Sequence, residues 1–245
     1  ARLLTVLAVF AVVAGQERLR IRGFDRQEGG KLLRYGGWVS VSSIVSPILT
    51  SLDQVLIGSH LGPAAVAHYA VPMNLAVRAQ LLAAALARTL FPRLSRADPI
   101  AAVDLSQTAT TALAYGFGAI SIIAMLVVEP FLILWIGADF AADATPVAHV
   151  LILGTWINGL AFIPLNLLQA QGRPAIVAKL HVAELLPFVG LLWLLVTEFG
   201  LVGAALAWTA RVTADAALLF WFSGLGPRRL WRILPPAGIL LAGYG

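Results

Sequence analysis

The sequence predicts an all-α membrane protein, a polytopic bundle of transmembrane helices. Hydrophobic residues make up 60% of the 245 residues and charged residues only 12%, whereas soluble proteins carry about 25% charged residues. Apolar stretches of about 20 residues, enough for one bilayer crossing, recur along the chain. The alternating pattern of a membrane β-barrel is absent from the sequence. Helices satisfy their own backbone hydrogen bonds in lipid, so we expect every span to be helical.

The spans are placed by length and by the positions of charged and turn residues, because nearly every residue within them is apolar. Partial spans are expected at residues 1–15 and from about 233. Both ends of the chain fall inside an apolar run, so we expect a piece of a longer protein. The six complete spans are predicted at 36–60, 65–91, 107–137 with a break near Glu129 and Pro130, 145–170, 174–198 and 200–222.

Lys and Arg collect in every second connector between these spans. The basic connectors are residues 16–35, 92–100, 171–174 and 224–232, and the connectors between them carry no Lys or Arg. By the positive-inside rule, the basic connectors face the cytoplasm. The net charge of +5 is therefore spread over one membrane face, which argues against a nucleic-acid partner, because such proteins gather positive charge in a stripe.

Signatures of catalysis are missing from the sequence. With no cysteine there is no disulfide, thiolate metal site or cysteine nucleophile. The motifs GxSxG, HExxH and the phosphate-binding P-loop do not occur. His181 and Glu184 have the spacing of half a metal site, but no further ligand accompanies them. We therefore expect neither a metal nor another cofactor, and no enzymatic activity.

Charged residues inside the predicted spans are the main functional signal, because an ionised side chain at mid-depth costs a few kcal/mol. Arg88 and Lys179 lie about one turn from a cytoplasmic span end and can extend their charges to the surface. Arg211 and Asp215 are four residues apart and can form a local ion pair. The complete set is Asp53, Arg78, Arg88, Lys179, Glu184, Arg211 and Asp215.

Arg78 lies near the middle of its span, with no acidic residue within one turn. Its guanidinium must meet a carboxylate on another helix or face water, and we expect Asp53 as its partner. Asp53 ends a polar stripe with Ser43, Ser46 and Thr50, which fall within an arc of about 80° on an ideal helix. The stripe faces either an aqueous cavity or a close helix–helix contact. Asn158 adds a further polar group at depth.

Two long segments resemble a known family. The run GGWVSVSSIVSPILTSLDQVLIGSHLGPAAVAHYAVPMNLAVRAQLLAAALARTLFPRLSRAD, from Gly36 to Asp98, resembles the polysaccharide transporter branch of the multidrug/oligosaccharidyl-lipid/polysaccharide flippase superfamily, the Wzx-like O-antigen flippases. Downstream, EPFLILWIGADFAADATPVAHVLILGTWINGLAFIPLNLLQAQGRP and FGLVGAALAW are similar to later helices of that family. The resemblance covers most of the chain from Gly36 to about Ser223.

The resemblance implies half of a MATE-like transporter built from two helical bundles. Residues 1–15 would end the N-terminal bundle, and residues 16–35 would form a basic cytoplasmic linker. Residues 36–223 would then form the C-terminal six-helix bundle, followed at 224–245 by a cytoplasmic loop and the start of a further span. The N-terminal bundle, which supplies the other wall of a central cavity, would lie outside this chain.

The resemblance also implies a flippase that moves undecaprenyl-diphosphate-linked oligosaccharide repeats across the bacterial inner membrane by alternating access. On depth and charge, Arg78 and Arg211 are candidate diphosphate ligands. The groups expected to contact sugar or water are Ser43, Ser46, Thr50 and Asn158. Asp53, Glu184 and Asp215 are candidate counter-charges or sites of Na+ or H+ coupling. Membrane lipid and the polysaccharide polymerase machinery are the expected partners.

Three other functions stay open at this point, and the first of them, a purely structural membrane subunit, is opposed by the deep Arg78. A cation-coupled multidrug exporter of the same superfamily would need acidic residues to dominate the cavity, whereas Arg is prominent among the deep charges. A membrane-embedded glycosyltransferase or O-antigen ligase would need a long outward loop for its catalytic residues. The longest outward connector here is short.

Overall fold

The computed structural model describes residues 26–225, and the two predicted partial spans lie outside this range. The chain divides into two compact units, Ala1–Gly37 and Trp38–Gly245; the packing described below is that of the second unit. Residues 26–225 contain helices and short turns and no strand. The predicted all-α fold of a polytopic membrane helix bundle is therefore confirmed.

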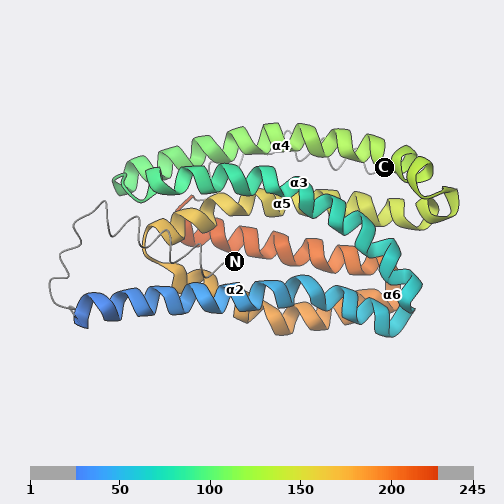
Figure 1. Cartoon of the computed structure of the whole chain (residues 1–245), viewed down its shortest axis with the longest axis horizontal. Coiled ribbons are helices and arrows are strands. Elements are labelled where there is room, and N and C mark those ends of the chain that lie inside the picture. The colour runs from blue at the N-terminus through green and yellow to red at the C-terminus, as the bar shows by residue number, and fades with distance from the viewer. Residues whose placement is uncertain (1–25, 226–245) are drawn as a thin grey trace, which may run out of the picture. The chain divides into compact units, whose positions relative to one another are not determined.

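Five helices follow one another with very short connections (Figure 1). Each contains a segment long and apolar enough to cross a bilayer. Their ranges are α2 Arg26–Leu61, α3 Pro63–Leu94, α4 Pro99–Trp135, α5 Ala138–Ala170 and α6 Pro174–Ser223. The break predicted near Glu129 and Pro130 is wrong, because α4 continues as a helix through Pro130 to Trp135.

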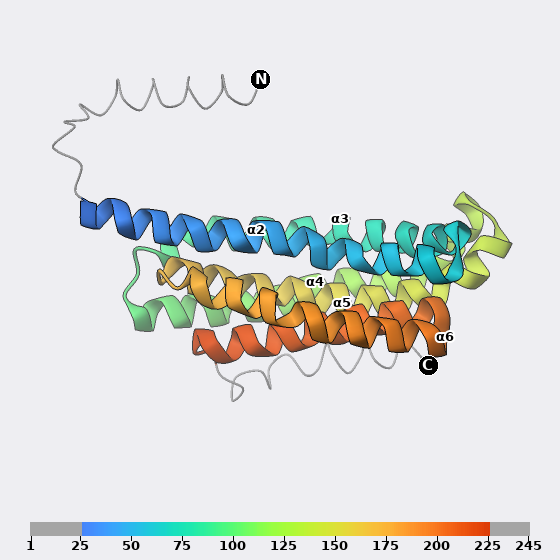
Figure 2. The same cartoon turned by 90° about the horizontal axis from the view of Figure 1, so that it is seen from below.

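The last helix consists of two antiparallel parts joined at Gly200. A straight helix of 50 residues would be about 75 Å long, far more than the roughly 30 Å of a hydrocarbon core. Gly200 leaves the helical conformation at φ 58°, ψ −132°, and the two parts run side by side in opposite directions in Figures 1 and 2. The predicted separation of spans near residue 199 is thus correct, and residues 26–225 hold six helical segments.

Helix starts follow from local chemistry at the connections. Pro63, Pro99 and Pro174 occupy first-turn positions, where a missing N–H costs no hydrogen bond. Asp98 caps α4 by accepting hydrogen bonds from the backbone N–H groups of Ile100 and Ala101, both at 3.0 Å. These signals explain the very short connections, which force successive helices to run antiparallel.

Helix α5 forms the centre of the bundle and packs against α3, α4 and α6. Small residues allow this contact: a Cβ on Gly154 would lie 2.6 Å from the Trp208 ring, and one on Gly159 would lie 2.7 Å from Phe117. The Trp156 indole donates a hydrogen bond of 3.1 Å to the backbone carbonyl of Ala114 on α4. Close packing and such cross-helix bonds hold the helices together where lipid offers no hydrophobic driving force.

The two ends of the bundle differ in charge. The turns at Gly62, Ile136–Gly137 and Gly200 lie at one end in Figure 1, and no Lys or Arg of the described residues lies near them. Arg96 and Arg173 lie in the turns at the other end, and Arg93 lies beside them in the last turn of α3. Large apolar side chains such as Leu186, 84% exposed, cover the outer surface between the ends, as expected of helices that face lipid.

Candidate functional site

Three of the predicted deep charges, Glu184, Arg211 and Asp215, meet inside the α6 hairpin together with His181. Arg211 Nη1 lies 3.4 Å from Glu184 Oε2, and their side chains are only 9% and 10% exposed. One turn closer to the basic end, His181 Nε2 lies 4.0 Å from Asp215 Oδ1. These pairs form because antiparallel helices joined at Gly200 bring residue 184 opposite 211 and residue 181 opposite 215.

The local ion pair expected between Arg211 and Asp215 is therefore wrong. Both residues lie on one face of the second part of α6, but each pairs with the first part of the helix instead. The Arg211 guanidinium also lies 5.3 Å from the centre of the Phe188 ring, within the range of a cation–π contact. Arg211 is thus buried and engaged, so its predicted role as a diphosphate ligand requires this ion pair to open.

Asp53 joins this cluster from α2. It is fully buried, and its carboxylate accepts hydrogen bonds from the Tyr69 hydroxyl at 2.5 Å and from the Gln54 backbone N–H at 2.8 Å. It also interacts electrostatically with Arg211. The three predicted counter-charges, Asp53, Glu184 and Asp215, therefore lie in one region of the bundle with Arg211. We call these four residues, together with His181 and Tyr69, the Arg211 cluster.

The Arg211 cluster holds more carboxylates than cations. Arg211 is paired with Glu184 and interacts electrostatically with Asp53, and the carboxyl groups of Glu184 and Asp215 lie close enough to interact with each other. Among the described residues, Glu184 Oε1, Asp215 Oδ1, His181 Nδ1 and Arg211 Nε are buried without a hydrogen-bond partner. No group of three or more His, Asp or Glu side chains in residues 26–225 is arranged to hold a metal ion. Because the cluster has more carboxylates than cations, protonation of one carboxylate or binding of a monovalent cation would change the stability of the α6 hairpin.

Arg78 lies outside this cluster, and its predicted pairing with Asp53 is wrong. Tyr69 and Arg78 are nine residues apart on α3, so they project from opposite faces of the helix, and Asp53 bonds to the Tyr69 face. The Arg78 side chain is exposed and forms no hydrogen bond or ion pair in the described part of the chain. One turn away, Asn74 is also exposed and donates a hydrogen bond of 2.8 Å to the carbonyl of Ala70.

The polar stripe predicted on α2 is divided between two environments. Asp53 lies with Leu49 and Ile57 on a buried face. Ser43 is exposed, and its hydroxyl donates a hydrogen bond of 2.9 Å to the carbonyl of Val39. Ser46 is half-buried, and the side chain of Thr50 lies outside the described residues. The stripe therefore does not present its carboxylate and its hydroxyls to a single space.

Asn158 is half-buried on α5, and nothing described brings it near Arg78 or the Arg211 cluster. Two buried polar contacts escaped sequence reasoning. Tyr69 was not singled out, although a tyrosine hydroxyl within a span needs a polar partner, and Asp53 on the preceding helix provides one. Gln80, buried on α3, donates a hydrogen bond of 3.3 Å to the carbonyl of Thr155 on α5.

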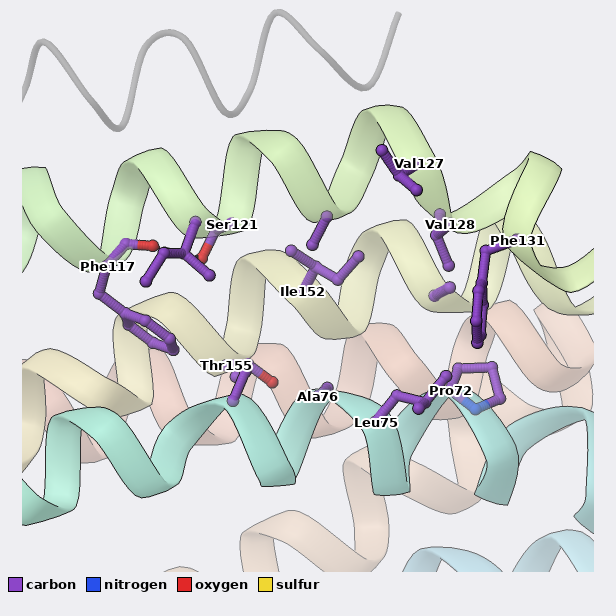
Figure 3. A pocket seen from close by; sticks show the side chains of 14 residues that line it. Pro72, Leu75, Ala76, Phe117, Ser121, Val127, Val128, Phe131, Ile152 and Thr155 are labelled. Atoms are coloured by element: carbon purple, nitrogen blue, oxygen red, sulfur yellow. Dashed lines mark hydrogen bonds between the residues drawn. The ribbon is translucent and has the colours of Figure 1, made fainter.

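A pocket of about 220 Å³ lies between α3, α4 and α5 (Figure 3). Phe117 and Phe131 mark its two ends along α4, and Pro72 and Ala76 of α3 and Ile152 of α5 also line it. Thr155 and Ser121 supply its only hydroxyl groups. The volume is below the roughly 300–1,000 Å³ of ordinary ligand pockets, and the lining is apolar, so a glycan has no place in it.

Comparisons with known proteins agree with the resemblance seen in the sequence. Residues 2–98 match a family model described as "Polysaccharide biosynthesis protein". Over 222 residues the chain is 31% identical to a Shigella flexneri protein named "Putative O-antigen transporter". That match covers 90% of this chain but 53% of the relative, so the chain spans about half the length of the relative it matches. No solved structure matches the chain.

The aligned relative, the family model and the helical fold agree with one another. Helices long and apolar enough to cross a bilayer make the chain a multi-pass membrane protein. Both matches carry descriptions from polysaccharide biosynthesis, and the relative is named as a transporter rather than an enzyme. The chain is therefore similar to polysaccharide biosynthesis proteins and to a protein named as an O-antigen transporter.

Proposed function

We propose that the protein containing this chain is a flippase of the bacterial inner membrane. It moves undecaprenyl-diphosphate-linked oligosaccharide repeats from the cytoplasmic to the outer leaflet during polysaccharide biosynthesis. The name of the relative and the description of the family support this general role. The observation that carries the proposal is Arg78, an exposed and unpaired arginine at the middle of a membrane helix.

The position of Arg78 is what an anionic substrate requires. α3 has 32 residues and is therefore about 48 Å long, and Arg78 lies at its midpoint. A charge there is separated from either surface of a hydrocarbon core of roughly 30 Å by about 15 Å. Keeping an unpaired guanidinium at this depth costs a few kcal/mol. A diphosphate, which cannot cross hydrocarbon alone, provides the matching negative charge. Its oxygens accept bidentate hydrogen bonds from the planar guanidinium of Arg78.

The remaining parts of the mechanism follow the two-bundle scheme. An N-terminal bundle outside this chain would supply the opposite wall of a cavity. Residues 36–223 would rock against it in alternating access. Residues 1–15 would end the first bundle, residues 16–35 would link the bundles in the cytoplasm, and residues 224–245 would lead to a further span. Ser43, Ser46, Thr50 and Asn158 would contact sugar or water during this movement.

Ion coupling would belong to the Arg211 cluster. The cluster has three carboxyl groups, Asp53, Glu184 and Asp215, and one arginine across α2 and both parts of α6, so binding of H+ or Na+ would neutralise an excess carboxylate. Opening of the Glu184–Arg211 pair would then free Arg211 to contact diphosphate. The cluster is thus the element through which an ion gradient could act on the hairpin. The polymerase machinery that consumes the repeats would be a functional partner.

The burial of the acidic residues argues against the cation exporter. A cationic drug needs carboxylates on an accessible surface, but Asp53, Glu184 and Asp215 are all buried. The accessible charge at mid-depth is Arg78. A glycosyltransferase or ligase is disfavoured as well, because the outward turns at Gly62, Ile136–Gly137 and Gly200 are too short to hold a catalytic domain.

The test replaces Arg78 in the full-length protein in its native host. Arg78→Ala should abolish surface polysaccharide and leave lipid-linked repeats in the inner leaflet, while the amount of inserted protein stays normal. Arg78→Lys should restore transport partly if charge alone matters and poorly if the bidentate fork is needed. Val77→Ala, at the neighbouring exposed position, is the matched control. Normal polysaccharide in the Arg78→Ala strain would refute the role of Arg78.

A further inference from the structure

The exposed face of α3 carries a second arginine in line with Arg78. At 100° per residue, Asn74, Arg78 and Arg88 fall within an arc of about 80°, and all three side chains are exposed. Leu81 and Ala85 lie between them on the same face and are exposed too. The buried residues of α3 occupy the opposite side; they include Tyr69, Met73, Gln80, Ala83 and Ala87.

The two arginines lie at different depths. Arg88 is about ten residues from the midpoint of α3, which places its Cα roughly 14 Å from the middle of the helix. Half of a hydrocarbon core is about 15 Å, so Arg88 lies at the level of lipid phosphates on the basic side of the bundle. Arg78 lies at mid-depth, and Asn74 lies about 7 Å beyond the midpoint. The face therefore carries hydrogen-bond donors from one membrane surface to past the centre.

Arg88, like Arg78, has no hydrogen bond or ion pair in the described part of the chain. Other basic residues near the same end are engaged with the protein. Arg173 donates a hydrogen bond of 3.2 Å to the carbonyl of Phe222, and the Lys179 ammonium lies 5.8 Å from the Trp38 ring centre. The guanidinium of Arg88 is thus available to an anion from outside the bundle.

We propose that Arg88 makes the first contact with the diphosphate of the lipid-linked saccharide and that Arg88, Arg78 and Asn74 form an anion track along α3. This inference rests on the proposed function. The diphosphate of a lipid in the cytoplasmic leaflet lies at the height of Arg88, and positive charge at that height attracts it. The next cation on the same face is Arg78, about 15 Å deeper. Asn74 then offers an amide donor on the far side of the midpoint.

The track separates capture from crossing, and this gives the two arginines different kinetic roles. Arg88 acts before the substrate leaves the leaflet, so its loss weakens capture and leaves later steps unchanged. Arg78 acts where the diphosphate is deepest, so its loss slows the crossing itself. The rival role for Arg88 is contact with bilayer phospholipids, in which case its guanidinium supports membrane placement and does not affect substrate affinity.

The experiment uses the full-length protein in liposomes with a fluorescent polyprenyl-diphosphate-linked N-acetylhexosamine as probe, and measures initial flipping rates over a range of probe mole fractions. Arg88→Ala should raise the half-saturating mole fraction about tenfold, the effect of losing one charge-assisted contact, with a maximum rate within about twofold of the unmodified protein. Arg88→Lys should recover most of the affinity. Arg93→Ala, which removes an exposed arginine that projects from a different face of α3, is the matched control.

The outcomes separate this inference from the proposed function. If Arg88→Ala behaves like Arg93→Ala while Arg78→Ala lowers the maximum rate, the track is refuted and Arg88 contacts bilayer lipid only. If Arg88→Ala lowers only the amount of inserted protein or its thermal stability, the track is refuted too. If the unmodified protein does not flip the probe, or Arg78→Ala flips it normally, the proposed function itself fails. A raised half-saturation point with normal insertion supports the track.

Discussion

Replacing Arg211 by Met should destabilise the protein far more than replacing its partner Glu184 by Gln. Arg211 is the guanidinium that pairs with Glu184 and interacts electrostatically with Asp53, and its side chain is 9% exposed. Its removal leaves the buried Glu184 carboxylate without its partner, and breaking a buried pair in this way costs about 3–5 kcal/mol. Methionine keeps the apolar length of the side chain, so the loss reports charge rather than packing.

Glu184→Gln should cost only about 1 kcal/mol, the range of one ordinary hydrogen bond. Arg211 keeps the electrostatic attraction of Asp53, and the repulsion between Glu184 and Asp215 disappears. The double variant should be no less stable than Arg211→Met alone, because Arg211→Met leaves Glu184 as an unpaired charge. The asymmetry between the two single variants follows from the excess of carboxylates and does not arise in an isolated ion pair.

The measurement is equilibrium unfolding of the full-length protein in mixed lipid–detergent micelles, followed by tryptophan fluorescence. Arg78→Met is the control, because Arg78 is exposed and makes no ion pair in residues 26–225; it should not lower stability. Equal losses for Arg211→Met and Glu184→Gln, or a larger loss for Glu184→Gln, would contradict the charge balance described for the cluster.

Two further variants test single contacts by the same unfolding measurement. Tyr69→Phe removes the hydroxyl that donates to buried Asp53 and should lower the free energy of unfolding by about 1–3 kcal/mol. Its control, Tyr115→Phe at an exposed position, should change that free energy by less than about 0.5 kcal/mol. Equal effects of the two substitutions would contradict the role of the buried bond. Gly200→Ala forces a side chain into φ 58° and should cost about 1–3 kcal/mol, whereas Gly190→Ala, with no atom within 4 Å of the added Cβ, should stabilise its helix by roughly 0.5–1 kcal/mol.

The helices could be predicted from the sequence because length and turn residues determine membrane spans. The spans at 65–91 and 145–170 lie within α3 and α5, and the separation near residue 199 corresponds to the turn at Gly200. The predicted break at Pro130 was wrong because proline in a membrane helix removes one hydrogen bond without ending the helix. The sequence also hid the early start of α4, since residues 99–106 are less apolar than a span needs.

The partners of the deep charges could be predicted only in part. That Asp53, Glu184, Arg211 and Asp215 need compensation followed from their depth. Which of these side chains pair with each other depends on the rotation of the helices and on the register of the α6 hairpin. A uniformly apolar sequence does not determine either of them. Asp53 and Arg78 lie on consecutive helices and are opposite in charge. Arg78, however, is nine positions after Tyr69, which places it on the opposite face of α3 from the one that meets Asp53.

The turn at Gly200 has a consequence for how the protein is made. Each charged residue near the centre of an isolated helix opposes membrane insertion by about 2.5–3.5 kcal/mol, so residues 201–223, with Arg211 and Asp215, would insert poorly alone. Glu184 and His181 sit at matching heights in the preceding helix. We therefore expect the two parts of α6 to enter the membrane together as a hairpin, with Arg211 already paired with Glu184 and Asp215 with His181. The short turn at Gly200 keeps the second part beside the first during synthesis.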